Sequence, residues 1–375
     1  MFSTKMRLRR FGSAVLAACL CCAASGQSSS PGSGEGLAGG NGGTEHIATG
    51  NSAEDLPGTL KSLRREVNTG HASEALKEIA DLRAKHGEAP GLSRVEGLAD
   101  YALGNVKAAE EAFAVALQND PSDQESLQMR GLALYGLGRS ADAIPLLEAA
   151  GRVVAKGDAS IGKADPNYLL ALCYMDTQRY DDARHAMAAQ YRFPADSPEA
   201  YLLAARMLFR REYLPAAQSF AEKAIALEPN LPLAHELLGE IALAGNRLDE
   251  AIADLEKERA HNPLEGLIYD RLGDAYDRAA RYDDAQRSLE EAVLLEPNST
   301  GPYILLGKTL LKKNDPLGAA TYLEHAKQMD PSNYITHTLL VQAYRAMGRR
   351  EDATREAETS RKLLAAREPK FEKVP

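Results

Sequence analysis

The stretch from Gly301 to Thr309 is the arrangement in this sequence that comes nearest to a phosphate-binding site. It reads Gly-Pro-Tyr-Ile-Leu-Leu-Gly-Lys-Thr, and a glycine loop ending in Lys-Thr can cradle phosphate oxygens on its backbone N–H groups. That motif has four residues between its glycines, whereas this stretch has five and falls inside a predicted helix. We therefore predict that no nucleotide binds here.

The remaining reactive side chains form no catalytic set. None of the eight histidines belongs to an H-E-x-x-H zinc pair, and His235 and His337 occupy bulky positions of predicted helices, where packing is expected. Cys173 lies at a small-residue position, which favours a buried, unreactive thiol. No nucleophile, base and orienting group converge. We predict no enzyme activity, no cofactor and no bound metal.

The elements that carry these residues recur with a period of 34. Four prolines have this spacing: Pro229, Pro263, Pro297 and Pro331. Nine alanines share it, apart from one step of 40 between the third and the fourth: Ala75, Ala109, Ala143, Ala183, Ala217, Ala251, Ala285, Ala319 and Ala353. A fixed period of this length indicates stacked helical repeats. The sequence therefore predicts an all-α fold.

Five of the nine units contain a glycine inside the first predicted helix, where glycine costs about 1 kcal/mol relative to alanine. The glycines are Gly97, Gly131, Gly239, Gly273 and Gly307. We expect a close approach of two helices at each glycine, with the alanine column on the opposite side. The prolines should end the second helices, because proline lacks the N–H group and restricts the preceding residue.

The run Leu272-Gly273-Asp274-Ala275-Tyr276, followed by Ala285, Leu289, Ala292 and Pro297, resembles the tetratricopeptide repeat. The resemblance covers about residues 56–367 as nine units. It implies an α-solenoid, a right-handed superhelix of helix-turn-helix repeats, whose first helices line a concave groove that binds peptides.

The chain is predicted to have four regions: a signal peptide (1–26), a disordered Ser/Gly-rich linker (27–55), the repeat array (56–367) and a C-terminal tail (368–375). The third repeat contains a six-residue insertion near Gly157. The predicted repeats span 56–89, 90–123, 124–163, 164–197, 198–231, 232–265, 266–299, 300–333 and 334–367.

Two processing routes fit the leader, in which basic residues precede a short apolar stretch. Ala24-Ser25-Gly26 offers small residues for cleavage before Gln27. Alternatively, Leu16-Ala17-Ala18-Cys19 resembles the lipobox of bacterial lipoproteins, which implies lipidation of Cys19. Either route predicts export to the periplasm or the outer membrane of a bacterial envelope, or secretion, with membrane contact only through the possible lipid anchor.

Charge argues against a nucleic-acid partner. Removing residues 1–26 takes away four basic and no acidic side chains, so the formal charge changes from -9 to -13. Binding to phosphates requires clustered Lys and Arg instead. The expected partner is a protein or peptide segment.

On the resemblance, the inward-facing residues of the first helices form three blocks. These are an apolar block of Tyr101, Tyr135, Tyr168, Met175 and Phe209, an acidic block of Glu236, Glu240, Asp270, Asp274 and Asp277, and a basic block of Lys308, Lys312 and Arg345. The acidic block is either a solvated face or a site for a cationic or extended partner segment. The apolar block is either helix packing or an interaction surface.

These observations predict a non-catalytic scaffold that binds a protein or peptide in its groove, in envelope assembly, secretion or trafficking. One alternative is a regulatory subunit of an envelope enzyme complex, and a less favoured one is an enzyme with a site formed in the groove. Affinity capture separates the first two, because it returns either many client proteins or one enzyme in fixed proportion.

Overall fold

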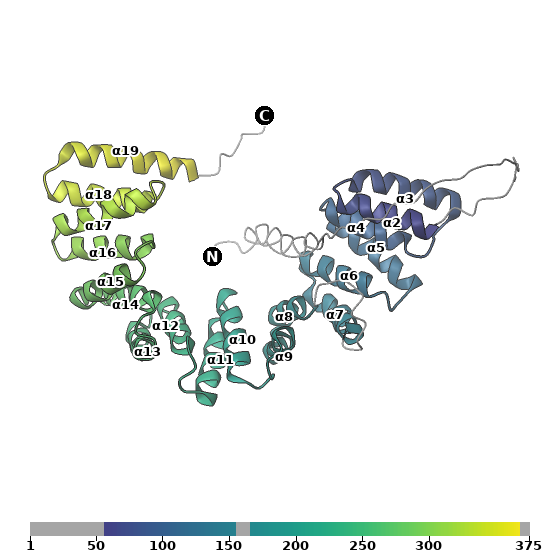
Figure 1. Cartoon of the computed structure of the whole chain (residues 1–375), viewed down its shortest axis with the longest axis horizontal. Helices are drawn as coiled ribbons and strands as arrows, with labels where there is room; N and C mark the ends of the chain where they lie inside the picture. The colour runs from purple at the N-terminus through teal and green to yellow at the C-terminus, as the bar shows by residue number, and fades with distance from the viewer. Residues whose placement is uncertain (1–55, 155–165, 368–375) are drawn as a thin grey trace, which may run out of the picture. The chain divides into compact units, whose positions relative to one another are not determined.

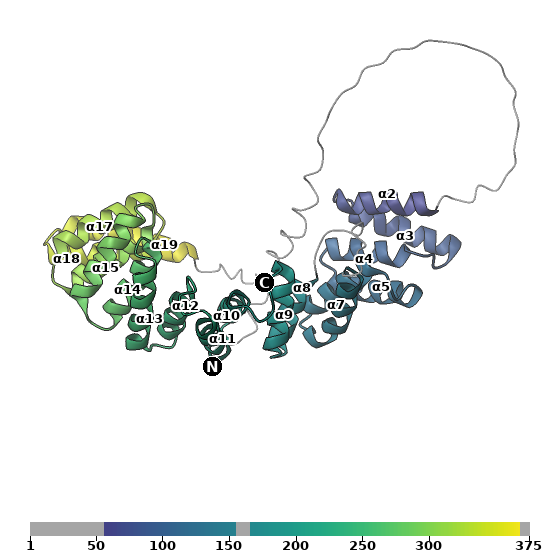
Figure 2. The same cartoon turned by 60° about the horizontal axis from the view of Figure 1, so that its bottom comes forward.

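The structure is a computed structural model that describes residues 56–154 and 166–367. Within these ranges the chain forms eighteen α-helices and no strand. Successive helices pack as hairpins (Figure 1), and the same pairing is visible in the rotated view of Figure 2. The predicted all-α fold of nine helix pairs is therefore confirmed. The chain divides into two compact units, the first ending at Arg192 and the second beginning at Phe193.

The first unit contains four of the helix pairs. Its helices are α2 (Leu56–Asn68), α3 (Ala72–His86), α4 (Leu92–Ala102), α5 (Val106–Asn119), α6 (Gln124–Gly136), α7 (Ser140–Val154), α8 (Asn167–Asp176) and α9 (Tyr180–Tyr191).

The second unit contains the other five pairs. Its helices are α10 (Pro198–Arg210), α11 (Leu214–Leu227), α12 (Ala234–Ala244), α13 (Leu248–His261), α14 (Gly266–Arg278), α15 (Tyr282–Leu295), α16 (Thr300–Lys312), α17 (Pro316–Met329), α18 (Tyr334–Ala346) and α19 (Arg350–Arg367).

Several predictions concern segments outside the described residues. They are the signal peptide (1–26) with Cys19, the linker (27–55), the insertion near Gly157 and the tail (368–375). They stay predictions.

The two helices of a pair cross where the first helix has its glycine. A Cβ atom added at Gly273 would lie 2.4 Å from the side chain of Leu289, and one added at Gly307 would lie 2.5 Å from that of Leu323. The same relation joins Gly97 to Phe113 on α5. The expectation that alanines cover these glycines is therefore wrong, because a large side chain sixteen residues later fills the space. The alanine column is fully buried beside it.

The turn between the two helices of every pair places one residue in the left-handed region. Four pairs use glycine there (Gly70, Gly104, Gly138 and Gly348), and five use other residues (Gln178, Glu212, Asn246, Ala280 and Asn314). In the α14–α15 turn, the N–H group of Arg281 after this residue donates to the carbonyl of Tyr276, 2.9 Å away. This bond closes the end of α14 in the manner of a Schellman motif.

Proline ends or begins helices as predicted. Pro229, Pro263, Pro297 and Pro331 follow α11, α13, α15 and α17, and Pro215 and Pro316 lie in the first turns of α11 and α17. A missing N–H group costs nothing in a first turn, since that group has no partner within the helix. Within the described ranges, the helices lack the length and apolar character that crossing a membrane requires.

Candidate protein-binding surface

The first helices of the second unit contact one another in order: α10 with α12, α12 with α14, α14 with α16, and α16 with α18. Residues one period apart on these helices therefore share one surface. We call this surface the first-helix face and define it by Arg206, Glu240, Asp274 and Lys308, which are 34 residues apart.

Most charges of the first-helix face pair between neighbouring repeats. Arg206 on α10 lies 2.6 Å from the Glu236 carboxylate on α12, and Arg271 on α14 lies 2.9 Å from that of Glu240 on α12. Two carboxylates of the predicted acidic block are thus paired with arginines outside the predicted basic block. Such pairs fix the register of one repeat on the next and leave less charge open to a partner.

Asp277 is the most buried carboxylate of the acidic block. Its Oδ2 atom lies 2.8 Å from Lys308 Nζ and 2.9 Å from Lys312 Nζ, and the Thr309 hydroxyl donates to Oδ1 at 3.2 Å. Burial alone would raise the pKa of Asp277, but the two lysines outweigh burial and hold this pKa below its usual value. Asp277 is therefore a structural carboxylate that joins α14 to α16, and a partner cannot reach it.

Glu236 is also buried, at the start of α12. The neighbouring carboxylate of Glu258 is fully buried and accepts the backbone N–H groups of Leu233 at 2.8 Å and His235 at 3.1 Å. This cap satisfies the donors at the N-terminus of α12. Burial raises the pKa of Glu236, and the ion pair with Arg206 opposes that rise.

Asp270 and Asp274 are the carboxylates of the acidic block that no cation of a neighbouring repeat reaches within the described ranges. Asp270 Oδ1 is buried and accepts no hydrogen bond from any described residue, and the nearest cation, Arg271, is 3.8 Å from Oδ2. Asp274 is about one-third exposed and lies 3.5 Å from Arg278. Burial raises the pKa of Asp270, Arg271 lowers it, and Asp274 and Glu296 raise it further. Among the described residues, the only cations within 4 Å of these two carboxylates are therefore arginines of the same helix.

The apolar block has mixed exposure. On the first helices of the first unit, Tyr101 and Tyr135 are half-buried, and Tyr168 is 42% exposed. Met175 is fully buried in the packing around α8, so its side chain contacts the core instead of an open surface. In the second unit Phe209 is half-buried on α10.

The basic block divides in the same way. Lys308 and Lys312 share Asp277, whereas Arg345 is exposed on α18 and forms no ion pair with the described residues. The two lysines keep more than one-third of their side chains exposed beside the buried carboxylate. Their positive charge is therefore only partly cancelled.

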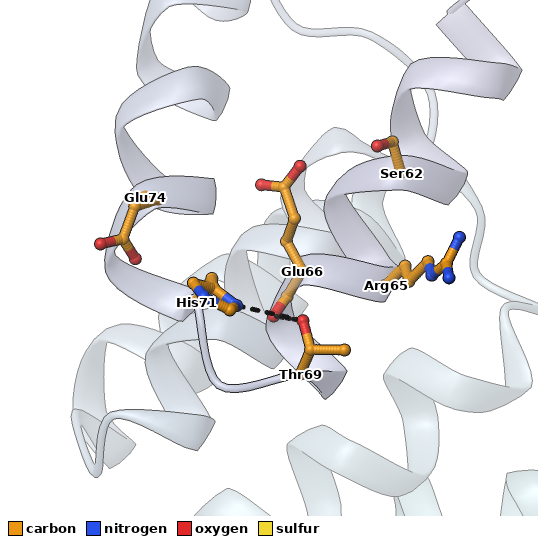
Figure 3. Close-up of a pocket in the computed structure, with 6 residues that line it drawn as sticks. All are labelled: Ser62, Arg65, Glu66, Thr69, His71 and Glu74. Atoms are coloured by element: carbon orange, nitrogen blue, oxygen red, sulfur yellow. Dashed lines mark hydrogen bonds between the residues drawn. The ribbon is translucent and has the colours of Figure 1, made fainter.

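One small hollow lies apart from this face, at the α2–α3 turn (Figure 3). It has a volume of about 450 Å³ and is lined by Ser62, Arg65, Glu66, Thr69, His71 and Glu74. Thr69 Oγ1 and His71 Nδ1 are 3.2 Å apart, and the Thr69 hydroxyl also donates to the Glu66 carbonyl at 3.0 Å. Ser62, Arg65 and Glu74 point away from that pair. The polar contacts tighten a helix turn and assemble no catalytic set.

The sequence profile of the tetratricopeptide repeat matches residues 60–124, 129–200 and 271–334, which together exceed half of the chain. The chain belongs to the tetratricopeptide repeat family. Its tetratricopeptide repeats support a role as a protein-interaction scaffold. A relative from Arabidopsis thaliana, the chloroplastic tetratricopeptide repeat domain-containing protein PYG7, is 31% identical over 109 residues. That match covers 28% of this chain and only 36% of the relative.

Solved structures of similar fold include the MamA protein and YrrB. MamA is 17% identical, with 48% of this chain and 100% of that chain covered and a TM-score of 0.44. YrrB, described as a TPR protein with an unusual peptide-binding site, is 19% identical. The match covers 50% of this chain and 95% of YrrB, with a TM-score of 0.43.

The tetratricopeptide resemblance pointed to the first helices but missed their cross-repeat pairs. Arg271, Thr309 and the capping Glu258 were absent from the predicted site. A signal for the pairs does exist in the sequence, because the partners Arg206 and Glu236 are 30 residues apart and Glu240 and Arg271 are 31 apart. Opposite charges about one repeat apart on first helices indicate ion pairs within the chain.

Proposed function

We propose that this protein is a non-catalytic tetratricopeptide scaffold that binds an extended protein segment on its first-helix face. A lysine or arginine of that segment contacts Asp270 and Asp274. The observation that carries this proposal is that Asp274 is about one-third exposed, and that Asp270 and Asp274 have, as cations within 4 Å, only arginines of their own helix among the described residues.

The pairing pattern supports a cationic partner at this position. Glu236, Glu240 and Asp277 already have cations from neighbouring repeats, so their charge is compensated within the chain. A hydrogen bond to a charged group contributes about 1.5–3 kcal/mol, and leaving a buried carboxylate unpaired costs a comparable amount. A partner cation at the partly exposed carboxylate of Asp274 gains such a bond.

A random peptide library displayed on phage tests the site without a known partner. Peptides selected on the full chain should be enriched in lysine and arginine, and they should bind the Asp270→Asn/Asp274→Asn variant about tenfold or more weakly. The matched control is Asp249→Asn/Asp283→Asn, which removes two exposed carboxylates, one from α13 of the preceding repeat and one from α15 of the same repeat. Equal binding to the two variants would eliminate this site.

We further propose that the chain acts in the cell envelope, on the basis of its leader sequence. Mass spectrometry of the mature N-terminus distinguishes the two anchoring routes: a free N-terminus at Gln27 contradicts lipidation of Cys19, and a lipid-modified Cys19 contradicts release. Crosslinking in the native envelope then identifies the partner. Recovery of one enzyme in fixed proportion would replace the scaffold proposal with that of a regulatory subunit.

A further inference from the structure

Two leucines of the second unit are exposed to an unusual degree. Leu264, in the turn between α13 and α14, is 81% exposed, and Leu294, near the end of α15, is 73% exposed. Both values exceed those of every other large apolar side chain in the described ranges. Side chains this exposed contribute little to packing of the fold.

The two leucines are close in sequence to one contact between the start of α14 and the end of α15. A Cβ atom added at Gly266, the first residue of α14, would lie 2.6 Å from Glu296 Cγ just beyond α15. Leu264 precedes Gly266 by two residues, and Leu294 precedes Glu296 by two residues. Each leucine is therefore two residues before one member of this α14–α15 contact.

A polar hollow adjoins this contact. It has a volume of about 550 Å³ and lies between α13, α14 and α15. The Tyr269 hydroxyl in its lining donates to the carbonyl of Pro263, the residue before Leu264, at 2.9 Å. Glu290 and Glu291 in the same lining are one helical turn before Leu294. The hollow and the leucines thus form a continuous surface.

Negative charge is left over on this surface. The arginines of the hollow already have partners, since Arg259 pairs with Glu256 and Arg287 pairs with Asp284. Glu265 and Glu291 are exposed, and their carboxylates form no ion pair within the described residues. Each exposed leucine therefore has an unpaired glutamate close by.

We infer that this surface, the leucine edge (Leu264, Leu294, Glu265 and Glu291), binds an amphipathic basic segment of a partner protein. Apolar side chains of the segment cover the two leucines, and its lysines or arginines contact the two glutamates. Charge complementarity selects this occupant, because the unpaired carboxylates repel an anionic lipid surface. The leucine edge shares no residue with the first-helix face or with Asp270, so variants at the two sites distinguish the two proposals.

The test uses the full chain and a synthetic amphipathic peptide of leucine and lysine, labelled for fluorescence polarisation. The Leu264→Ser/Leu294→Ser variant should bind this peptide about tenfold or more weakly, because two leucines lose their apolar contacts. Its thermal unfolding should match that of the parent chain. Leu317→Ser is the matched control, since Leu317 is 65% exposed at the start of α17 and away from the edge.

A second, independent test changes the charge of the leucine edge. The Glu265→Gln/Glu291→Gln variant should bind the leucine–lysine peptide more weakly, and this binding should depend less on salt concentration. A leucine–glutamate peptide should bind the parent chain poorly. Asp270→Asn/Asp274→Asn should leave this interaction unchanged, which separates it from the first-helix face.

Three outcomes would overturn the inference. The first is equal peptide binding by Leu264→Ser/Leu294→Ser and Leu317→Ser. The second is binding to vesicles of phosphatidylcholine and phosphatidylglycerol that depends on the two leucines, which would make the occupant a membrane. The third is a dimer in sedimentation analysis that Leu264→Ser/Leu294→Ser abolishes, which would make the occupant a second copy.

Discussion

Replacing Gly307 by alanine tests how closely the helices of a repeat approach. The added Cβ atom would lie 2.5 Å from Leu323 Cγ, 2.8 Å from Cδ2 and 3.1 Å from Cδ1. Carbon atoms in favourable contact are about 3.5–4.0 Å apart, so the overlap reaches about 1 Å. Leu323 is fully buried and cannot turn toward solvent, so α16 and α17 must move apart.

Two opposing effects set the magnitude. Overpacking a core costs about 1–3 kcal/mol, whereas alanine in place of glycine in a helix gains about 1 kcal/mol. Gly301 on the same helix provides the control, since its added Cβ atom meets nothing within 4 Å. Subtracting the effect of Gly301→Ala from that of Gly307→Ala removes most of the gain in helix propensity. The steric difference that remains should be about 1–3 kcal/mol in the free energy of local unfolding.

Hydrogen exchange measured by mass spectrometry is the suitable assay, because repeat arrays open locally and need not unfold in one step. Protection of α16 and α17 should be about 5- to 150-fold lower in Gly307→Ala than in Gly301→Ala. The cavity-forming Leu323→Ala change should partly rescue Gly307→Ala in a double-mutant cycle. Equal protection in the two alanine variants would refute the close approach.

Three further predictions concern strain and charge. Ala280 has a φ of 58°, and the left-handed conformation costs a non-glycine residue about 1–2 kcal/mol. Ala280→Gly should therefore raise the free energy of unfolding by about 1 kcal/mol, as measured by thermal unfolding. A lower stability of the variant would contradict this strain. Asp270→Asn should stabilise the second unit by about 1 kcal/mol at neutral pH, since it removes an unpaired buried charge. Because the folded-state pKa of Asp270 is raised, the stability gain of Asp270→Asn over the parent chain should shrink as pH falls through that pKa toward about 4. A gain that stays constant with pH in denaturant titrations would contradict this explanation. Asp277→Asn should cost about 2 kcal/mol, because two lysines lose their carboxylate. The folded-state pKa of Asp277 is lowered, so its contribution to stability is present above about pH 4 and is lost as pH falls through that pKa. The free energy of unfolding of Asp277→Asn should therefore depend less on pH in an acid titration than that of the parent chain.

The fold was predictable because repeats have local signals that recur. Proline recurs with a period of 34 after four of the second helices, five of the first helices contain a glycine at the same repeat position, and neighbouring repeats make the same contacts. The left-handed turn residue went unpredicted, although Gly70, Gly104 and Gly138 share the period. Five repeats place other residues at this position, which hides the column from residue identity alone.

The candidate site was predictable only in part. The sequence indicated which helices carry the site and that Asp270, Asp274 and Asp277 share a helical face. It did not indicate that Asp277 is buried under two lysines while Asp270 keeps an unpaired oxygen. Three carboxylates on one helix thus have different environments, because each faces a different part of the neighbouring repeats.

Periodic spacing and helix-ending residues specify the helices, their pairing and the family, since these signals act over a few turns of chain. Which charges remain open to a partner depends on the packing of one repeat on the next. The distance from Arg206 to Glu236 or from Asp277 to Lys308 depends on how one repeat sits on the next. The same packing leaves Leu264 and Leu294 exposed.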